Sequence, residues 1–443
     1  MSKARKVLIL SYYFPPMGMG GTQRVAKFCK YLPEFGWSPV VVTVKPVAYY
    51  AHDTSLLDNV NAAEIHRTHS LDPLRMLALR IKDHSQPEAS GNPQSRRNWR
   101  GNNLLNRLNA LLNWLLVPDT KLLWLPFAIF RALKIMRRQQ IDLIYTTSPP
   151  HSIHLAGAFL KRRTGKKWIT DFRDDWSGGE SQPCPTRLHL ALNRYLEKLI
   201  LKESDAIVGI CRQLVDTLYN KSISKHATCK VITNGFDADD FKSDAAIIQS
   251  AKFTIVHCGS ISNVSTPEPF LAALDSVFRQ HPRLRANITV KFIGVDVFGK
   301  LTPLLEKYRL HDVVEFTPYL PHRMAIEQML RAHVLLLLVT KKTGEEVITS
   351  KVFEYLASGR RILAIIPSGE LAEILTSARA GKIIADNQHV YEIANAILAF
   401  YQDYLNKKLD TKPTDFITRY ERKYLTRELA TLFDELWTSG SNI

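Results

Sequence analysis

The chain has 443 residues, about three times the length of a typical domain, so two large domains are expected. Its hydrophobic fraction of 45% and charged fraction of 23% exclude a disordered chain, a collagen-like rod and a disulfide-rich miniprotein. The net charge of +17 is uneven, because residues 1–250 carry +14 and residues 251–443 only +3. The basic half suits an anionic membrane, a nucleic acid or a phosphorylated substrate, or its charge serves only solubility.

The first half alternates strand and helix patterns. Apolar β-rich runs at residues 7–12 and 40–44 predict buried parallel strands, with a helix at residues 22–32 between them. Residues 46–106 break this rhythm and predict an irregular insertion. Four further strands are predicted, at residues 141–145, 168–171, 206–210 and 229–232.

Residues 104–138 alternate apolar blocks with lysine and arginine. Two interpretations stay open: a pair of core helices separated by Pro118, or a basic amphipathic surface that lies at a membrane interface. The longest uncharged apolar stretch, residues 108–118, is shorter than the roughly 20 residues that span a bilayer. Neither a spanning segment nor a signal peptide is therefore expected, and membrane contact would be peripheral.

The second half repeats the strand and helix alternation after a linker at residues 237–252. Its six strands are predicted at residues 253–257, 288–293, 313–316, 334–339, 362–366 and 382–385. The fold class is α/β: two Rossmann-like doubly wound domains, residues 1–236 and 253–412, that face each other across a cleft. Residues 413–443 form a last helix that packs back on the first domain.

The loop PPMGMGG at residues 15–21 lies between the first strand and its helix. Its glycines allow backbone N–H groups to approach an anion at a helix N-terminus, although many such loops are only tight turns. It does not fit the dinucleotide pattern GxGxxG, because Gln23 stands where the last glycine would fall.

A second group of candidate residues follows the predicted strand at residues 334–339. Thr349 or Ser350 is expected to cap a helix, and Glu354 lies one turn further on, on the side of Lys351. A diphosphate beside Lys351 and ribose hydroxyls on Glu354 would make a nucleotide site. The alternative is an acidic loop followed by a helix with a solvated glutamate.

The third group is DFRDDW at residues 171–176, where a first-domain strand ends. Asp174 is expected to orient or deprotonate a hydroxyl, and Arg173 to hold Asp171 or meet a phosphate, unless all three form a structural network. His151, at the end of the neighbouring strand, faces the cleft or is structural.

Metal sites have little support in the sequence. The five cysteines show no CxxC spacing, which indicates a reduced, cytoplasmic setting without structural zinc. The DxD-like run at residues 237–240 falls in the linker, and GxxxxGK[ST] is absent.

These motifs, in this order, resemble the retaining glycosyltransferases of family 4, which have the two-Rossmann GT-B fold. The stretches that carry the resemblance are PPMGMGG at 15–21, DLIYTTSPPH at 142–151, WITDFRDDW at 168–176, VITNGFD at 231–237 and KVFEYLASGRRILA at 351–364. The family's two glutamates, seven residues apart, correspond to Glu346 and Glu354.

By position, the resemblance implies that Glu354 binds the donor ribose. Glu346 and the backbone of Ile348, Thr349 and Ser350 hold the donor sugar and diphosphate, with Lys351 as countercharge. Gly20 and Gly21 approach the donor phosphates. On the acceptor side stand Asp174, His151 and Arg173, the last in place of the family's histidine. The implied reaction is metal-independent, with retention of the anomeric configuration.

Two positions depart from the family pattern. The Arg and Lys expected after the second domain's first strand are missing, since this stretch reads CGSISNVSTP at residues 258–267. Lys351 compensates, or donor affinity is weak, or the chain is not an active transferase. The glycine usual between the two glutamates is also missing, with Val347 and Thr349 in that stretch.

The function expected from these observations is sugar transfer from a UDP- or GDP-sugar to a cell-envelope or exopolysaccharide precursor. The acceptor is a glycan or a lipid-linked molecule at the inner membrane face, where the basic first domain meets anionic lipid. No cofactor and no nucleic acid is expected. The alternatives are a nucleotide-sugar epimerase of the same fold and a catalytically degenerate scaffold protein.

Overall fold

A computed structural model describes residues 4–18, 20–46, 51–72, 111–112, 114–178, 184–222, 227–242, 248–339, 348–384, 389–409 and 413–440. The chain divides into two compact units. Unit 1 comprises residues 1–233 and 422–443, and unit 2 residues 234–421. Each unit has its own sheet and its own apolar core.

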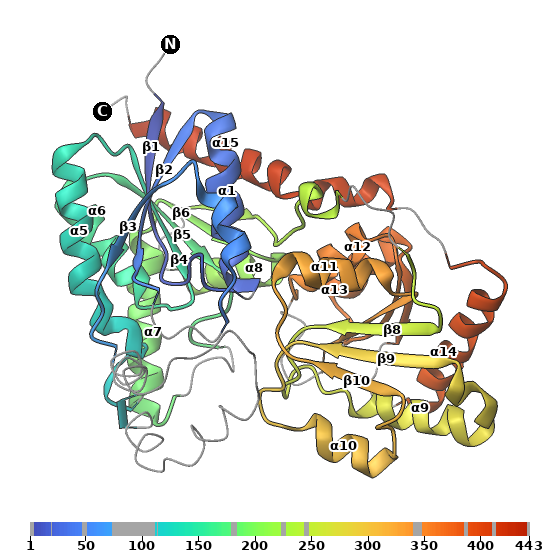
Figure 1. Cartoon of the computed structure of the whole chain (residues 1–443). Coiled ribbons are helices and arrows are strands. Elements are labelled where there is room, and N and C mark those ends of the chain that lie inside the picture. Colours follow the sequence, from blue (N-terminus) through green and yellow to red (C-terminus); the bar gives the residue numbers. More distant parts are fainter. Residues whose placement is uncertain are drawn as a thin grey trace, which may run out of the picture. The chain divides into compact units, whose positions relative to one another are not determined.

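Unit 1 contains a seven-stranded parallel sheet in the order β3-β2-β1-β4-β5-β6-β7 (Figure 1). Its strands are β1 (Arg5–Leu10), β2 (Trp37–Val44), β3 (Glu64–Thr68), β4 (Leu143–Ser148), β5 (Lys167–Phe172), β6 (Ala206–Gly209) and β7 (Thr228–Val231). The order reverses at β1, whose neighbours are β2 and β4. Ligands of such sheets bind at the carboxyl ends of the strands beside this reversal.

The helices of unit 1 connect these parallel strands. They are α1 (Gly20–Tyr31), η1 (Leu32–Phe35), η2 (Thr54–Val60), η3 (Thr120–Trp124), α5 (Leu125–Arg138), α6 (Ile153–Thr164), α7 (Arg187–Glu203), α8 (Arg212–Lys221) and α15 (Arg422–Gly440). Right-handed crossovers place α5, α6, α7 and α8 on one face of the sheet and α1 on the other.

The last helix, α15, packs against α1 in unit 1 (Figure 1). Phe433 is buried and meets Trp37 edge to face, with ring centroids 5.2 Å apart. The Trp37 indole also donates a hydrogen bond to Asp434 at 2.8 Å. Residues from both ends of the chain therefore build the core of unit 1.

Unit 2 contains a six-stranded parallel sheet in the order β10-β9-β8-β11-β12-β13. Its strands are β8 (Phe253–Cys258), β9 (Ile288–Ile293), β10 (Val314–Thr317), β11 (Val334–Leu338), β12 (Arg361–Ile365) and β13 (Gly381–Ile384). Its helices are η4 (Ala238–Phe241), α9 (Glu268–Gln280), η5 (Pro282–Ala286), α10 (Leu301–Tyr308), α11 (His322–Arg331), α12 (Lys351–Ala357), α13 (Glu370–Ala378), α14 (Val390–Leu405) and η7 (Asp415–Tyr420). The order again reverses at the first strand, β8.

The predicted α/β fold of two doubly wound sheets is confirmed, with one correction. The stretch expected to be an irregular insertion, residues 46–106, contains η2 and the edge strand β3 within its described part, residues 51–72. β3 reads EIHRT and is largely half-buried, so it lacks the continuous apolar run of a central strand. Among the described residues, no helix is both long and apolar enough to cross a bilayer.

Candidate active site

In unit 2, the end of β8 meets the start of α12. Gly259 follows β8 with a φ of +157°, a conformation that favours glycine. A Cβ built on Gly259 would overlap Nζ and Cε of Lys351. The Lys351 ammonium group therefore lies directly against the Gly259 backbone, at the place where the sequence lacks the family's Arg and Lys.

The surroundings of Lys351 alter its protonation. Burial lowers the pKa of Lys351 below its ordinary value, while the nearby Glu354 carboxylate acts in the opposite direction. An anion bound beside Lys351 would favour the charged form further. The charge of Lys351 therefore depends on the balance between its burial and the charges around it.

Tyr355, one helical turn beyond Lys351, anchors α12 to β8. Its hydroxyl accepts a hydrogen bond from the Cys258 backbone N–H at 2.8 Å and donates to the Leu336 carbonyl at 3.4 Å. Tyr355 is fully buried. These hydrogen bonds hold α12 against the end of β8. No sequence pattern marks this role, because Tyr355 sits in the helix as an ordinary core residue.

Glu354 faces a histidine that the sequence analysis did not select. His322 Nδ1 lies 3.9 Å from Glu354 Oε1, and His322 Nε2 lies 3.1 Å from Asp240 Oδ2. His322 is the first residue of α11, close after β10, and Asp240 belongs to η4. Asp240 is part of the DxD-like run that was assigned to the linker. The position of His322 after a strand end is the one signal that could have identified it.

The remaining donor-side candidates are less informative. Ser350 occupies the N-cap position of α12, yet its side chain makes no capping hydrogen bond, so the predicted cap is wrong for Ser350. Ile348 is buried, and Thr349 accepts a hydrogen bond from Val352 through its backbone carbonyl. Glu346 and Val347 lie outside the described residues. Because α12 has only seven residues, the cation in this part of the site is Lys351 rather than a helix dipole.

In unit 1, α1 begins within the glycine loop, and Gly20 and Gly21 are both exposed. A Cβ on Gly21 would come within 3.1 Å of Arg173 Nη1. Arg173 donates to the carbonyls of Ser148 at 2.7 Å and Pro149 at 3.0 Å, and also to that of Gly21. The Arg173 guanidinium thus joins the end of β4 to the start of α1, and this backbone clamp occupies its donors.

Asp171 pairs with Arg24, not with Arg173 as one interpretation expected. Arg24 Nε and Nη2 donate to the two Asp171 oxygens at 3.0 and 2.8 Å, and both side chains are fully buried. Thr147 donates to Asp171 at 2.7 Å, and Arg24 reaches the Thr233 carbonyl at 2.7 Å. Burial raises the pKa of Asp171, but Arg24 and these hydrogen bonds outweigh it, so the net pKa lies below its ordinary value.

Asp174 and His151 differ in what they offer an acceptor. Asp174 is half-buried, and burial raises its pKa although Arg173 opposes this. His151 is 1% exposed and stacks on Trp176, with ring centroids 5.2 Å apart. Burial, with the Arg173 and Lys221 charges, lowers the pKa of His151 to about 3, so the ring is neutral. His151 therefore packs beneath the loop, and Asp174 is the more accessible group.

The loop that carries Asp174 is fixed by a buried charge cluster. Lys221 pairs with Asp175 and, at 3.2 Å, with Glu197, while Ser177 donates to Glu197. Trp176 donates to Asn193 at 2.8 Å. These contacts join the loop to α7 and α8 and limit its movement.

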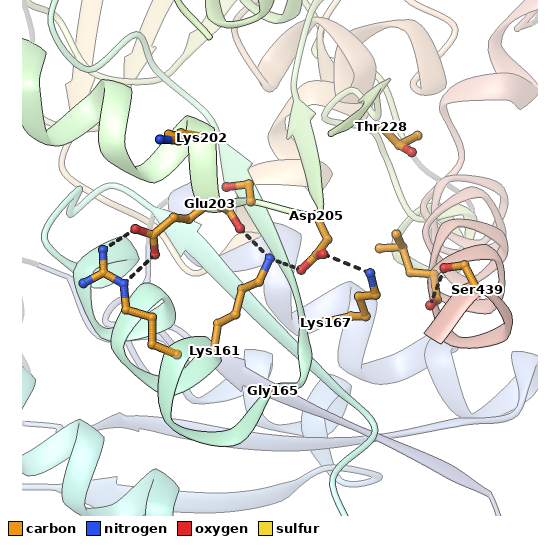
Figure 2. A pocket seen from close by; sticks show the side chains of 11 residues that line it. Lys161, Gly165, Lys167, Lys202, Glu203, Asp205, Thr228 and Ser439 are labelled. Carbon is orange, nitrogen blue, oxygen red and sulfur yellow. Dashed lines mark hydrogen bonds and ion pairs between the residues drawn. The ribbon is translucent and has the colours of Figure 1, made fainter. Parts of the chain in front are cut away.

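A pocket of about 620 Å³ lies at the opposite edge of the unit 1 sheet, beside the amino ends of β5 and β7 (Figure 2). Lys161 and Lys167 both pair with Asp205, at 2.5 and 3.2 Å, and Arg162 pairs with Glu203. Because these cations are neutralised by carboxylates and no candidate residue lines the pocket, we assign no ligand to it. No group of three or more His, Cys, Asp or Glu side chains suited to a metal ion occurs among the residues that the structure describes.

Comparison with known proteins identifies the class. Residues 19–235 match the family model of the glycosyl transferase 4-like domain, and residues 239–416 match that of the glycosyl transferases group 1. The chain thus carries two glycosyltransferase domains and is a glycosyltransferase of the GT-B type. None of the curated proteins matches its sequence.

Solved structures show the same fold. Sucrose-phosphate synthase from Thermosynechococcus elongatus aligns with a TM-score of 0.63 at 14% identity, covering 98% of this chain and 100% of that one. A glycosyltransferase from Rickettsia africae aligns with a TM-score of 0.62 at 12% identity, covering 98% of each chain. MnaA from S. aureus, in a structure with UDP, aligns with a TM-score of 0.52 at 13% identity, covering 96% of this chain and 94% of that one.

Proposed function

We propose that this glycosyltransferase uses a nucleotide sugar, UDP- or GDP-linked, and that unit 2 binds it. The observation that carries the proposal is the position of Lys351 against Gly259, with Glu354 one turn away in α12. Lys351 faces the diphosphate, Glu354 accepts hydrogen bonds from the ribose, and Glu346 holds the donor sugar. The backbone of Ile348, Thr349 and Ser350 completes the diphosphate contact.

The transfer reaction requires two contributions from the protein. As the sugar–phosphate bond breaks, negative charge grows on the departing diphosphate, and a fixed cation stabilises that charge more in the transition state than in the ground state. Lys351 supplies this cation without a metal ion. Asp174 orients the acceptor hydroxyl and accepts its proton, helped by a raised pKa. The assignment of Gly20 and Gly21 to the donor phosphates rests on the glycine loop in the sequence.

The proposal also covers the acceptor and the stereochemistry of the transfer. We assign retention of the anomeric configuration and an acceptor that is a cell-envelope or exopolysaccharide precursor, lipid-linked at an anionic membrane surface. The basic unit 1 supports the membrane part, since the residues up to position 250 carry a net charge of +14.

Thermal unfolding with UDP, GDP, ADP, CDP and dTDP tests the donor site. A ligand at about 100 times its dissociation constant adds about 2.7 kcal/mol, a visible rise in Tm. We expect a rise with UDP or GDP that Glu354→Gln abolishes and Glu306→Gln, at an exposed site on α10, leaves unchanged. No rise in Tm with any of the five nucleotides would support a degenerate scaffold. A separate product analysis without acceptor tests the epimerase alternative, which conversion of the sugar nucleotide would support.

A further inference from the structure

Three neighbouring helices of unit 1 present an unusual surface. α5, α6 and α7 contact one another in sequence on one face of the sheet (Figure 1). Large apolar side chains stand exposed on all three: Phe130 at 71%, Phe159 at 47%, Leu188 at 75% and Tyr195 at 63%. Single exposed apolar residues are ordinary, but a group of them over adjacent helices marks an interaction surface.

The group is densest at the start of α7. Leu188, Leu192 and Tyr195 recur at helical spacing and form one exposed stripe. The segment that carries exposed Trp114 and Leu115 lies against the start of α7, because His189 Nε2 is 2.6 Å from the Trp114 carbonyl oxygen and the two rings are 5.7 Å apart. We call Leu111, Trp114, Leu115, Leu188, Leu192 and Tyr195 the apolar cluster.

The exposed charged residues in the part of α7 that carries the stripe are positive: Arg187, Arg194 and Lys198. α5 and α6 contain no acidic residue. α7 contains two, of which Glu197 is buried against Lys221 and Glu203 pairs with Arg162. The further exposed or half-buried cations of α5 and α6 are Arg131, Lys134, Arg137, Arg138 and Arg163. Lys161, Arg162 and Lys202 instead line the pocket at the opposite edge of the sheet.

The cluster lies at the edge of the sheet that carries the acceptor-side residues. Helices that connect parallel strands run antiparallel to them, so the start of α7 lies at the carboxyl ends of β4 and β5. Asp119, which follows the Trp114 segment, accepts a hydrogen bond from Ser152 N–H at 2.9 Å, next to His151. A lipid held at the cluster is therefore on the same edge as Asp174.

We propose that the apolar cluster and the cations beside it on α7, Arg187, Arg194 and Lys198, dock unit 1 on an anionic lipid bilayer. Trp114, Leu188 and Tyr195 enter the interface, where aromatic and leucine side chains gain from burial, and the cations meet the lipid headgroups. The positive charge on α7 beside the cluster is what selects a bilayer over a second copy of this chain, whose matching surface would repel it. The inference deepens the proposed function, because it names the surface that would bring the protein to a lipid-linked acceptor.

Cosedimentation with phosphatidylcholine vesicles, with and without phosphatidylglycerol, tests the proposal on the full chain. We expect binding only with phosphatidylglycerol, weakened by salt. Arg187→Glu with Arg194→Glu should weaken it about tenfold or more, at about 1 kcal/mol for each cation near the surface. Arg283→Glu with Lys382→Glu makes the same charge change at exposed sites of unit 2 and should have little effect.

Quenching by brominated lipid reports whether tryptophan side chains enter the bilayer. Quenching of tryptophan fluorescence should fall in Trp114→Phe and Leu188→Ser, whereas Tyr391→Ser, at an exposed aromatic of α14, should quench like the wild type. Absence of binding to phosphatidylglycerol vesicles at low salt would overturn the proposal, as would a dimer in solution that Leu188→Ser dissolves. The nucleotide-induced rise in Tm should persist in the surface variants, so failure of docking and failure of the donor site are distinguished.

Discussion

The ammonium group of Lys351 occupies the space that a side chain on Gly259 would need. The two residues are far apart in sequence, and each alone has an ordinary explanation. Together they bring a positive charge to the end of β8, where the family pattern expects Arg and Lys and this sequence has neither. The positive charge at the end of β8 comes from the first residue of α12.

Removal of this charge should abolish donor binding. In Lys351→Met, which keeps much of the side-chain volume, the rise in Tm with the preferred nucleoside diphosphate should disappear. Lys382→Met, at an exposed lysine of β13, should keep it. A full nucleotide response in Lys351→Met would refute the role of Lys351.

In the absence of ligand, the difference in Tm between Lys351→Met and the wild type should depend on pH. Because burial lowers the Lys351 pKa in the folded state, the unfolded state binds the extra proton between that value and about 10.4. The cost to folding is complete below the folded pKa and declines as pH rises through this window. The Tm of Lys351→Met relative to wild type should therefore fall with rising pH, which thermal scans from pH 7 to pH 10 would measure.

Gly259→Ala should damage the donor site through geometry alone. An alanine Cβ would displace the Lys351 side chain and would also strain a backbone with positive φ. We expect loss of most nucleotide affinity with only modest loss of stability, measured by calorimetric titration and thermal unfolding. Gly165→Ala is the control, because it also has positive φ but its Cβ would meet nothing within 4 Å. Equal nucleotide affinity in the two variants would contradict the assignment.

The buried Arg24–Asp171 pair should be a major support of unit 1. Removing one partner leaves an uncompensated buried charge, so Arg24→Met should lower the free energy of unfolding by about 3–5 kcal/mol. Arg163→Met, at an exposed arginine of α6, should change it little. Urea titration followed by circular dichroism measures both.

Asp171 should also make the free energy of unfolding decrease at low pH, which we call the acid limb. Its pKa is lowered on folding, so the contribution is present above the unfolded value of about 3.9 and is lost as pH falls through the lower folded value. Asp171→Asn should flatten this acid limb. An unchanged limb would mean that other carboxylates govern acid unfolding.

Asp174→Asn should separate chemistry from donor binding. If Asp174 accepts the acceptor proton, kcat should fall by about 10²–10⁴-fold while the nucleotide-induced rise in Tm persists. Since burial raises the Asp174 pKa, the acid limb of the wild-type rate should lie above the ordinary value of about 3.9. Asp216→Asn, exposed on α8, serves as control, and a similar loss of kcat in both variants would exclude a role in catalysis.

The sequence by itself determined the fold class. Continuous apolar runs such as those in β1 and β11 are typical of strands that are buried on both faces of a parallel sheet, so strand positions follow from local composition. The edge strand β3 was not predicted, because a half-buried strand has no such apolar run. The motifs and their order can also be read directly from the sequence, and they were enough to identify the protein class as a glycosyltransferase.

The partners of the site residues were decided only by the tertiary structure. Asp171 had a neighbouring arginine in sequence, yet it pairs with Arg24, which α1 brings from 147 positions away. Glu354 faces His322, and Lys351 lies against Gly259, because parallel strands end at a common edge whatever their order in the chain. Burial then sets the charge of each group: it keeps His151 neutral and raises the pKa of Asp174, and no local pattern encodes burial.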